Sequence, residues 1–187
     1  MRRLFTALCL ALAAVSVQGC ATPRYNAEMF DVDPSRPYIL APGDRLRIIV
    51  FGQDSLSNSY SIDGSGQITM PLIGAVKAEG AATQALARTI ETRLRGGFLR
   101  DPKVTVEIEA YRPFFILGEV GTAGQYPYVN GMTVQTAVAI AGGFSPRAAK
   151  SYAVITRLID GAQIVGKVPI THPVRPGDTI SIRERFF

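Results

Sequence analysis

Short stretches of this chain alternate apolar and polar residues with the period of two that a strand buried on one face produces. The clearest stretch predicts a first strand over 44–51, and a similar alternation after Pro102 predicts another over 104–108. Further strands are predicted at 114–120, 125–129, 154–159, 162–168 and 179–183. The 18 glycines and 12 prolines of the chain agree with many short strands joined by turns.

Two glycine-containing reversals join neighbouring strands in this pattern. Asp63-Gly64-Ser65-Gly66 separates 60–62 from 67–70, and glycine supplies the positive φ angles that a tight reversal requires. Asp160-Gly161, with a predicted strand on either side, is the strongest short hairpin signal in the chain. Both pairs of segments are therefore predicted to form hairpins.

Two helices are predicted from apolar residues at helical spacing. In the first, apolar residues recur every four positions, Thr83 can cap the start, and Gly96-Gly97 ends the run. The second has Thr133 at its N-cap, a shared apolar face over 134–141, and Gly142-Gly143 at its end.

The N-terminal pattern predicts a removable export signal over residues 1–19. Arg2 and Arg3 precede a charge-free apolar run, 4–17, which is shorter than the roughly 20 residues that span a bilayer. Gly19-Cys20 resembles the end of the bacterial lipobox, in which the cysteine is acylated and becomes the first residue after cleavage. The working protein is therefore expected outside the cytoplasm, with an ordinary secretory signal cut nearby as the alternative.

Composition narrows the function further. Removal of the signal lowers the formal net charge from +5 to +3, because Arg2 and Arg3 leave with it. The other basic residues are scattered rather than gathered into a stripe, so nucleic-acid binding is not predicted. Cys9 also leaves with the signal and Cys20 would be acylated, so no disulfide is expected.

Two turns repeat one pattern, since Pro42-Gly43-Asp44 and Pro176-Gly177-Asp178 each precede a strand. Proline sets φ at about −65°, glycine allows a positive φ, and an aspartate carboxylate can accept hydrogen bonds from nearby backbone N–H groups. Asp44 and Asp178 are therefore predicted to be structural rather than catalytic.

Few residues suit catalysis. His172 is the only histidine, and without a free cysteine it cannot complete a metal site or a nucleophilic triad. Asp63 with Glu107 or Glu109 would be the carboxylate pair for glycoside hydrolysis, but both glutamates alternate with apolar strand residues and are expected to face solvent. Gly64-Ser65-Gly66 precedes a strand rather than a helix, so it is predicted to be a turn and not a phosphate cradle.

Two ordered sets of motifs between Tyr38 and Phe187 resemble the bacterial outer-membrane polysaccharide export proteins. The first set, which resembles the N-terminal export domain of that family, is Tyr38 to Leu46 with the first Pro-Gly-Asp turn, Val50-Phe51, Asp63 to Ile68, and Pro71 to Gly74. The second set, which resembles a soluble-ligand-binding β-grasp (SLBB) domain, is Leu117 to Val120, Gly124 to Tyr126, Thr133 to Gly143, and Val174 to Asp178.

The resemblance implies an α+β fold of two small mixed β domains. The export domain would cover 38–111 and the ubiquitin-like β-grasp SLBB domain 112–187, behind the signal peptide (1–19) and a lipid-anchored tether (20–37). It further implies no catalytic activity, no cofactor and no metal.

The function implied is transport of capsular polysaccharide or exopolysaccharide through a ring of identical subunits in the periplasm. The expected partners are the polysaccharide chain and an inner-membrane chain-length regulator or tyrosine kinase. Larger family members end in an amphipathic pore helix, whereas this chain ends at Phe187, so a separate outer-membrane β-barrel is also expected. Acyl chains at Cys20 would anchor the protein at the outer membrane, and Ala21 fits sorting to that membrane.

Two other functions stay open on sequence grounds. A lipid-tethered periplasmic module could bind a small soluble ligand in its β-grasp domain, and an enzyme could act on polysaccharide through the carboxylates named above. The candidate sugar-contact residues are Tyr60, Tyr111, Tyr126 and Tyr128, although packing in the core or between subunits explains such tyrosines better.

Overall fold

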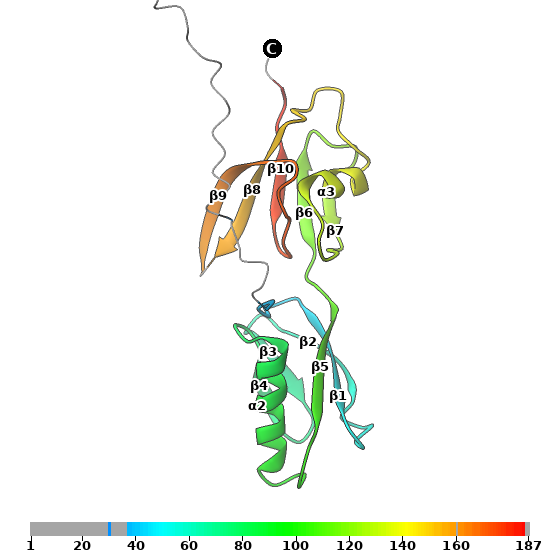
Figure 1. The fold of residues 1–187 in the computed structure, drawn as a ribbon, viewed down its shortest axis with the longest axis vertical. Coiled ribbons are helices and arrows are strands. Elements are labelled where there is room, and N and C mark those ends of the chain that lie inside the picture. The colour runs from blue at the N-terminus through cyan, green and yellow to red at the C-terminus, as the bar shows by residue number, and fades with distance from the viewer. Residues whose placement is uncertain (1–29, 31–36, 160, 186–187) are drawn as a thin grey trace, which may run out of the picture.

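The computed structural model of the chain describes Phe30, residues 37–159 and residues 161–185. Strands and helices are mixed in two units that stack end to end, each around a hydrophobic core of its own (Figure 1). The predicted α+β class is confirmed. Cys20 and the predicted signal peptide lie outside the described residues.

The first domain is built from β1 (Arg45–Val50), β2 (Asn58–Ser61), β3 (Gln67–Met70), β4 (Gly74–Lys77), α2 (Thr83–Arg95) and β5 (Val104–Ala110). Three strands form an antiparallel sheet in the order β2-β1-β5, and β3 pairs with β4 in a separate two-stranded sheet.

Alternation along β1 decides which face of the three-stranded sheet is buried. Leu46, Ile48 and Val50 are buried, whereas the residues between them are exposed. The spacing of four residues puts the buried residues of α2 on one side of that helix, and they enter the same core. Those residues are Leu86, Ile90 and Leu94, and burial of each such side chain contributes about 1.5–3 kcal/mol.

The hairpin predicted across Asp63-Gly64-Ser65-Gly66 is wrong as a strand pairing, although the turn itself forms. Gly66 N donates to Asp63 O at 2.9 Å, which closes the turn. The flanking strands pair elsewhere, because β2 takes the free edge of β1 and β3 pairs with β4. This arrangement lets β3 bury Ile68 and Met70 in the core, while β2 stays at an edge with no fully buried residue.

Both predicted helices form, but only one has the predicted cap. Thr83 is the first residue of α2 rather than its cap; Ala82 holds that position, and no side chain caps the helix. Thr133 does cap α3 (Val134–Ile140), because Thr133 Oγ1 accepts a hydrogen bond from Thr136 N and Thr136 Oγ1 accepts one from Thr133 N. The capping prediction is thus wrong at Thr83 and confirmed at Thr133.

The second domain contains β6 (Phe114–Gly118), β7 (Gly124–Tyr126), α3, β8 (Tyr152–Ile159), β9 (Ala162–Pro169) and β10 (Thr179–Ile182). Its five-stranded sheet has the order β7-β6-β10-β8-β9, and β10 runs parallel to β6. β8 and β9 pair as far as Ile159 opposite Ala162, which confirms the hairpin predicted at Asp160-Gly161.

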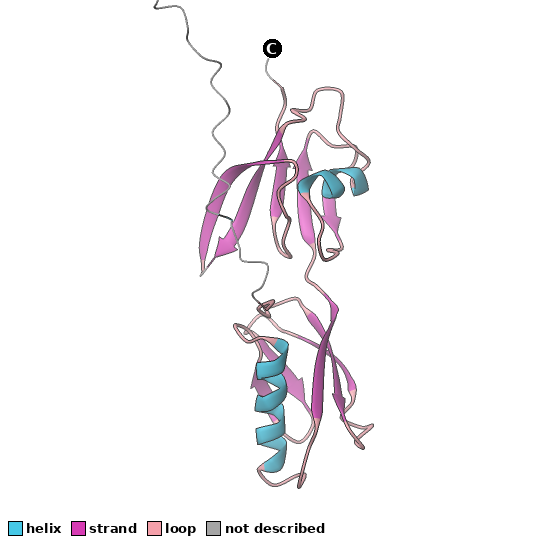
Figure 2. Ribbon diagram, in the orientation of Figure 1, coloured by secondary structure: helices cyan, strands magenta, loops and turns pink. Residues whose placement is uncertain are grey.

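α3 covers one face of this sheet (Figure 2). Phe114, Ile116 and Ile180 point from the sheet into the same core as Val134 and Val138 of the helix. The opposite face of the sheet carries no helix, so each strand has one buried and one more exposed side.

Within the described part of the chain, no helix is both long and apolar enough to cross a membrane.

Candidate functional site at the domain junction

The two Pro-Gly-Asp turns have the same backbone geometry. In the first, Asp44 N donates to Ala41 O at 3.2 Å and Gly43 has a φ of 91°. The second repeats this bond at 3.1 Å, with Gly177 at a φ of 84°. Proline at the second position and a positive φ at the third are the features of a type II turn.

Both aspartates are fully buried, and each carboxylate binds the backbone of its own turn. Asp44 Oδ2 accepts a hydrogen bond from Ala41 N at 3.0 Å, and Asp178 Oδ2 accepts one from Arg175 N at 2.8 Å. Arg157 adds two bonds to Asp178, from Nε to Oδ1 at 2.8 Å and from Nη2 to Oδ2 at 2.7 Å. A paired, two-pronged contact of this kind gives a buried carboxylate its counter-charge.

Arg112, in the segment that joins the two domains, lies between the two turns (Figure 1). Its backbone N donates to Asp44 Oδ1 at 2.9 Å, and its Nη1 lies 3.6 Å from Asp44 Oδ2. A Cβ added at Gly43 would lie 3.3 Å from Arg112 Cβ, and one added at Gly177 would lie 2.7 Å from Arg112 Nε. Glycine is therefore needed at both turns for its φ and for the close approach of this arginine.

A line of three tyrosines crosses the same junction. Tyr111 meets Tyr38 edge to face at a centroid distance of 5.0 Å and Tyr128 at 5.3 Å. Tyr38 Oη donates to Asp44 Oδ2 at 2.9 Å and accepts a bond from Arg112 Nη1 at 2.9 Å. Burial raises the pKa of Tyr38 and of Tyr128. Tyr111 and Tyr128, which the sequence offered as sugar contacts, thus pack against protein at the junction.

Phe30 belongs to the predicted tether, yet it is 2% exposed and packs in the core of the second domain. Arg157 Nη1 donates to Phe30 O at 3.2 Å, and the guanidinium carbon lies 5.2 Å from the centre of the phenyl ring. His172 meets that ring edge-on at 6.0 Å. A single aromatic residue among polar ones has no periodicity, so the sequence carried no signal for this contact.

The other two candidate tyrosines also contact their own domains. Tyr60 Oη donates to Leu56 O at 2.8 Å. Tyr126 Oη donates to Thr122 O at 2.8 Å, and its ring stacks on Phe114 with a centroid distance of 6.0 Å. Both hydroxyl groups therefore have a backbone partner.

The remaining motif glycines lie in turns. Gly66 has a φ of 76°, and its carbonyl accepts hydrogen bonds from Ala78 N and Glu79 N, both at 2.9 Å, whereas Gly64 has open space around it. Gly142 and Gly143 end α3 with φ values of 83° and 84°.

The candidate catalytic carboxylates have separate, local partners. Asp63 accepts a hydrogen bond from Ser65 Oγ at 2.6 Å, and this bond is the main reason that the pKa of Asp63 is lowered. Glu109 accepts a bond from Ser59 Oγ at 3.0 Å, and Glu107 is exposed on β5, which confirms that both glutamates face solvent. An exposed acid with a lowered pKa is poorly suited to donate a proton in glycoside hydrolysis.

No group of three or more metal-ligating side chains occurs among residues 30, 37–159 and 161–185. His172, the candidate that the sequence singled out, is 7% exposed rather than solvated.

The turn between β3 and β4 holds Leu72 at a φ of 70°, and Ile73 N donates to Pro71 O at 2.9 Å across it. This is a γ-turn of the rarer, strained form. A bulky residue at positive φ costs about 1–3 kcal/mol, and the Leu72 side chain is nevertheless 56% exposed. The strain therefore serves no burial within the same domain.

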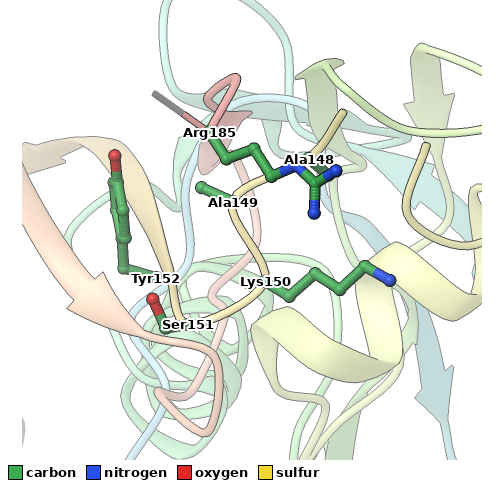
Figure 3. A pocket seen from close by; sticks show the side chains of 6 residues that line it. All are labelled: Ala148, Ala149, Lys150, Ser151, Tyr152 and Arg185. Atoms are coloured by element: carbon green, nitrogen blue, oxygen red, sulfur yellow. The ribbon is translucent and has the colours of Figure 1, made fainter. Parts of the chain in front are cut away.

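A shallow hollow of about 490 Å³ lies in the second domain, where the segment before β8 meets the chain after β10. Its lining residues are Ala148, Ala149, Lys150, Ser151, Tyr152 and Arg185. The Tyr152 ring lies on one side, and the charged ends of Lys150 and Arg185 extend toward the other (Figure 3). Lys167 Nζ covers the Tyr152 ring at 3.7 Å from its centre. An open hollow of this kind lacks the enclosing apolar walls of a typical small-molecule site.

Two family models match this chain. Residues 32–109 match the model described as polysaccharide biosynthesis/export protein, and residues 113–167 match the SLBB domain. Arg112 lies between the two matched regions.

Three curated relatives are similar over part of their length. The exopolysaccharide production protein ExoF of Rhizobium meliloti (strain 1021) is 33% identical over 141 residues, which cover 74% of this chain and 33% of ExoF. The EPS I polysaccharide export outer membrane protein EpsA of Ralstonia solanacearum is 31% identical over 153 residues, covering 66% of this chain and 40% of EpsA. The polysialic acid transport protein KpsD of Escherichia coli is 24% identical over 111 residues, covering 58% and 20% respectively. The matched region thus spans two fifths or less of each relative.

The two stacked α+β domains, the repeated Pro-Gly-Asp turns and both family matches agree. The chain therefore belongs to the polysaccharide biosynthesis/export family, with an SLBB domain of the β-grasp type after its export domain.

Proposed function

We propose that this chain is a component of a translocon that exports capsular polysaccharide or exopolysaccharide across the bacterial envelope. The observation that carries the proposal is the presence of an export domain and an SLBB domain in one chain, joined through the contacts of Arg112 with both Pro-Gly-Asp turns. The names of the relatives, which describe production, transport and export of polysaccharide, support the same class.

Identical copies of the chain would form a ring around the polymer. Head-to-tail contacts between identical subunits close into a ring when the rotation between neighbours allows it. A fixed junction favours this, because every copy then presents the same surfaces at the same angle. We assign the export domain to 38–111 and the SLBB domain to 112–187, and give the motif glycines and aspartates the structural role of fixing turns.

The location we propose is the periplasmic side of the outer membrane, with acyl chains on Cys20 as the anchor. Several acyl chains are needed for stable anchoring, since one chain binds a membrane only marginally. The partners would be the polysaccharide itself, an inner-membrane chain-length regulator or tyrosine kinase, and a further outer-membrane protein.

Deletion of the gene tests the proposal directly. We expect the loss of surface polysaccharide, measured by chemical assay of polymer released from washed cells, with restoration by the wild-type gene. A Cys20→Ser variant should restore less polymer and should lose acyl labelling, because the anchor is gone. Normal surface polysaccharide in the deletion strain would contradict the transport function, and unchanged acyl labelling of Cys20→Ser would contradict the anchor.

A further inference from the structure

Leu72 projects from the first domain on a turn that strains its own backbone. The β3–β4 loop is short, since Met70 and Gly74 lie opposite each other at the ends of the two strands. A glycine at the middle position would adopt the φ of 70° without strain, but the chain has a leucine there that is 56% exposed. Ile73, the next residue, already packs against the core. The domain itself therefore gains nothing visible from this leucine.

A second exposed apolar group lies at the end of β1. Ile49 is 42% exposed and Phe51 is 82% exposed, and their positions two residues apart place them on the same side of the strand. Both lie on the face of the sheet that points away from the core, since Ile48 and Val50 point inward. Large apolar side chains grouped on a surface mark interaction sites more often than single ones do.

Leu72 and this apolar pair lie on opposite sides of the first domain. The core that separates them is lined by Ile48 from the three-stranded sheet and by Ile68 and Val76 from the β3–β4 sheet. Two different apolar surfaces on opposite sides of one subunit are what a head-to-tail contact between identical subunits requires. A contact between two like surfaces would need only one of them.

We propose that Leu72 of one copy of this chain packs on Ile49 and Phe51 of the next copy. The proposal rests on the ring put forward under the proposed function, and it names the surfaces that build the ring. Arg47 and Glu107, opposite each other on β1 and β5, are exposed beside the apolar pair and supply a polar rim to the contact.

Cysteine cross-linking tests the pairing of the two surfaces. Residues 20–187 with Cys20→Ser contain no cysteine, so Leu72→Cys and Phe51→Cys can be introduced singly in that background. An oxidised mixture of the two single variants should form disulfide-linked dimers, while each variant alone should stay uncross-linked. The double variant should form a ladder of products that ends at the closed ring. Dimers of either single variant alone, or no dimers in the mixture, would overturn the proposed contact.

Leu72→Gly separates the contact from the folding of the domain. The glycine removes both the strain and the projecting side chain, so the unfolding midpoint of the dilute monomer should be unchanged or higher. Association, measured by sedimentation in mild detergent, should weaken at least tenfold. Phe98→Ala removes another exposed apolar side chain of the same domain, 50% exposed, and should leave association unchanged.

Each outcome has a separate meaning. Association that is equal in Leu72→Gly and wild type would overturn the assigned surface while leaving the ring standing. A wild-type chain that stays monomeric at every concentration would overturn both the surface and the ring.

Discussion

At the residue scale, the pair formed by Arg157 and Asp178 carries the charge that is most thoroughly removed from water. The two side chains are 6% and 0% exposed and meet at 2.7 Å, whereas the Lys77–Glu79 pair, also at 2.7 Å, is 59% and 46% exposed. Equal distances therefore conceal unequal consequences. A buried ion that loses its partner stays desolvated, while an exposed one is hydrated again.

We predict that Arg157→Met lowers the free energy of unfolding by about 3–5 kcal/mol, because Asp178 stays buried without a counter-charge. The measurement is urea unfolding followed by circular dichroism. Lys77→Met is the matched control and should change stability by about 0–1 kcal/mol, because that pair is exposed.

The double variant Arg157→Met/Asp178→Asn distinguishes charge from packing. It should recover part of the loss, since no charge then remains buried at this position. A double variant that is as unstable as the sum of its single changes would mean that the loss comes from packing against Phe30 instead.

At the scale of elements, the two helix starts show how far local sequence can predict structure. Both Thr83 and Thr133 stand before an amphipathic segment, and both were predicted to cap it. Only Thr133 does so, through a reciprocal bond with Thr136, because Ala82 takes the cap position of α2. A shift of one residue at a helix start is decided by the packing of the whole helix rather than by the capping residue.

We predict that Thr133→Ala destabilises the protein by about 1 kcal/mol, the usual loss for a threonine cap. Thr83→Ala should change stability by no more than a few tenths of a kcal/mol, because the threonine makes no capping bond. Thermal unfolding of the two variants beside wild type measures both values. Equal losses at the two threonines would contradict the assigned caps.

Strand pairing is the second lesson at this scale. The turn at Asp63 forms from local hydrogen bonds, which neighbours in sequence can predict. The partners of β2 and β3 depend instead on which pairing buries Ile68 and Met70, and that is a property of the assembled core. The hairpin at Asp160-Gly161 was predictable because both of its strands are eight residues long and share one register.

At the scale of the whole molecule, Arg112 links two units that otherwise have their own cores. Its backbone and side chain bind Asp44 and Tyr38 of the first domain, and Gly177 of the second domain packs against its guanidinium group. A ring of identical subunits needs this angle to be the same in every copy.

We predict that Arg112→Ala leaves both domains folded but loosens the angle between them. Small-angle scattering of the monomer should give a broader distribution of dimensions, with an unchanged circular dichroism spectrum. Arg47→Ala, which removes an exposed arginine from β1, should leave the distribution as in wild type. An unchanged distribution in Arg112→Ala would mean that the tyrosine line alone holds the junction.

The sequence by itself determined the elements whose causes are local: the ends of α3, the two Pro-Gly-Asp turns, the Asp160-Gly161 hairpin and the alternation that buries one face of β1. It also carried the motifs that point to polysaccharide export. Only the tertiary structure decided where Phe30 packs, that the two repeated turns meet at Arg112, and that Leu72 and Phe51 lie on opposite sides of one domain. Turns and caps follow from hydrogen bonds among neighbouring residues, whereas contacts between residues far apart in sequence arise only when the cores assemble.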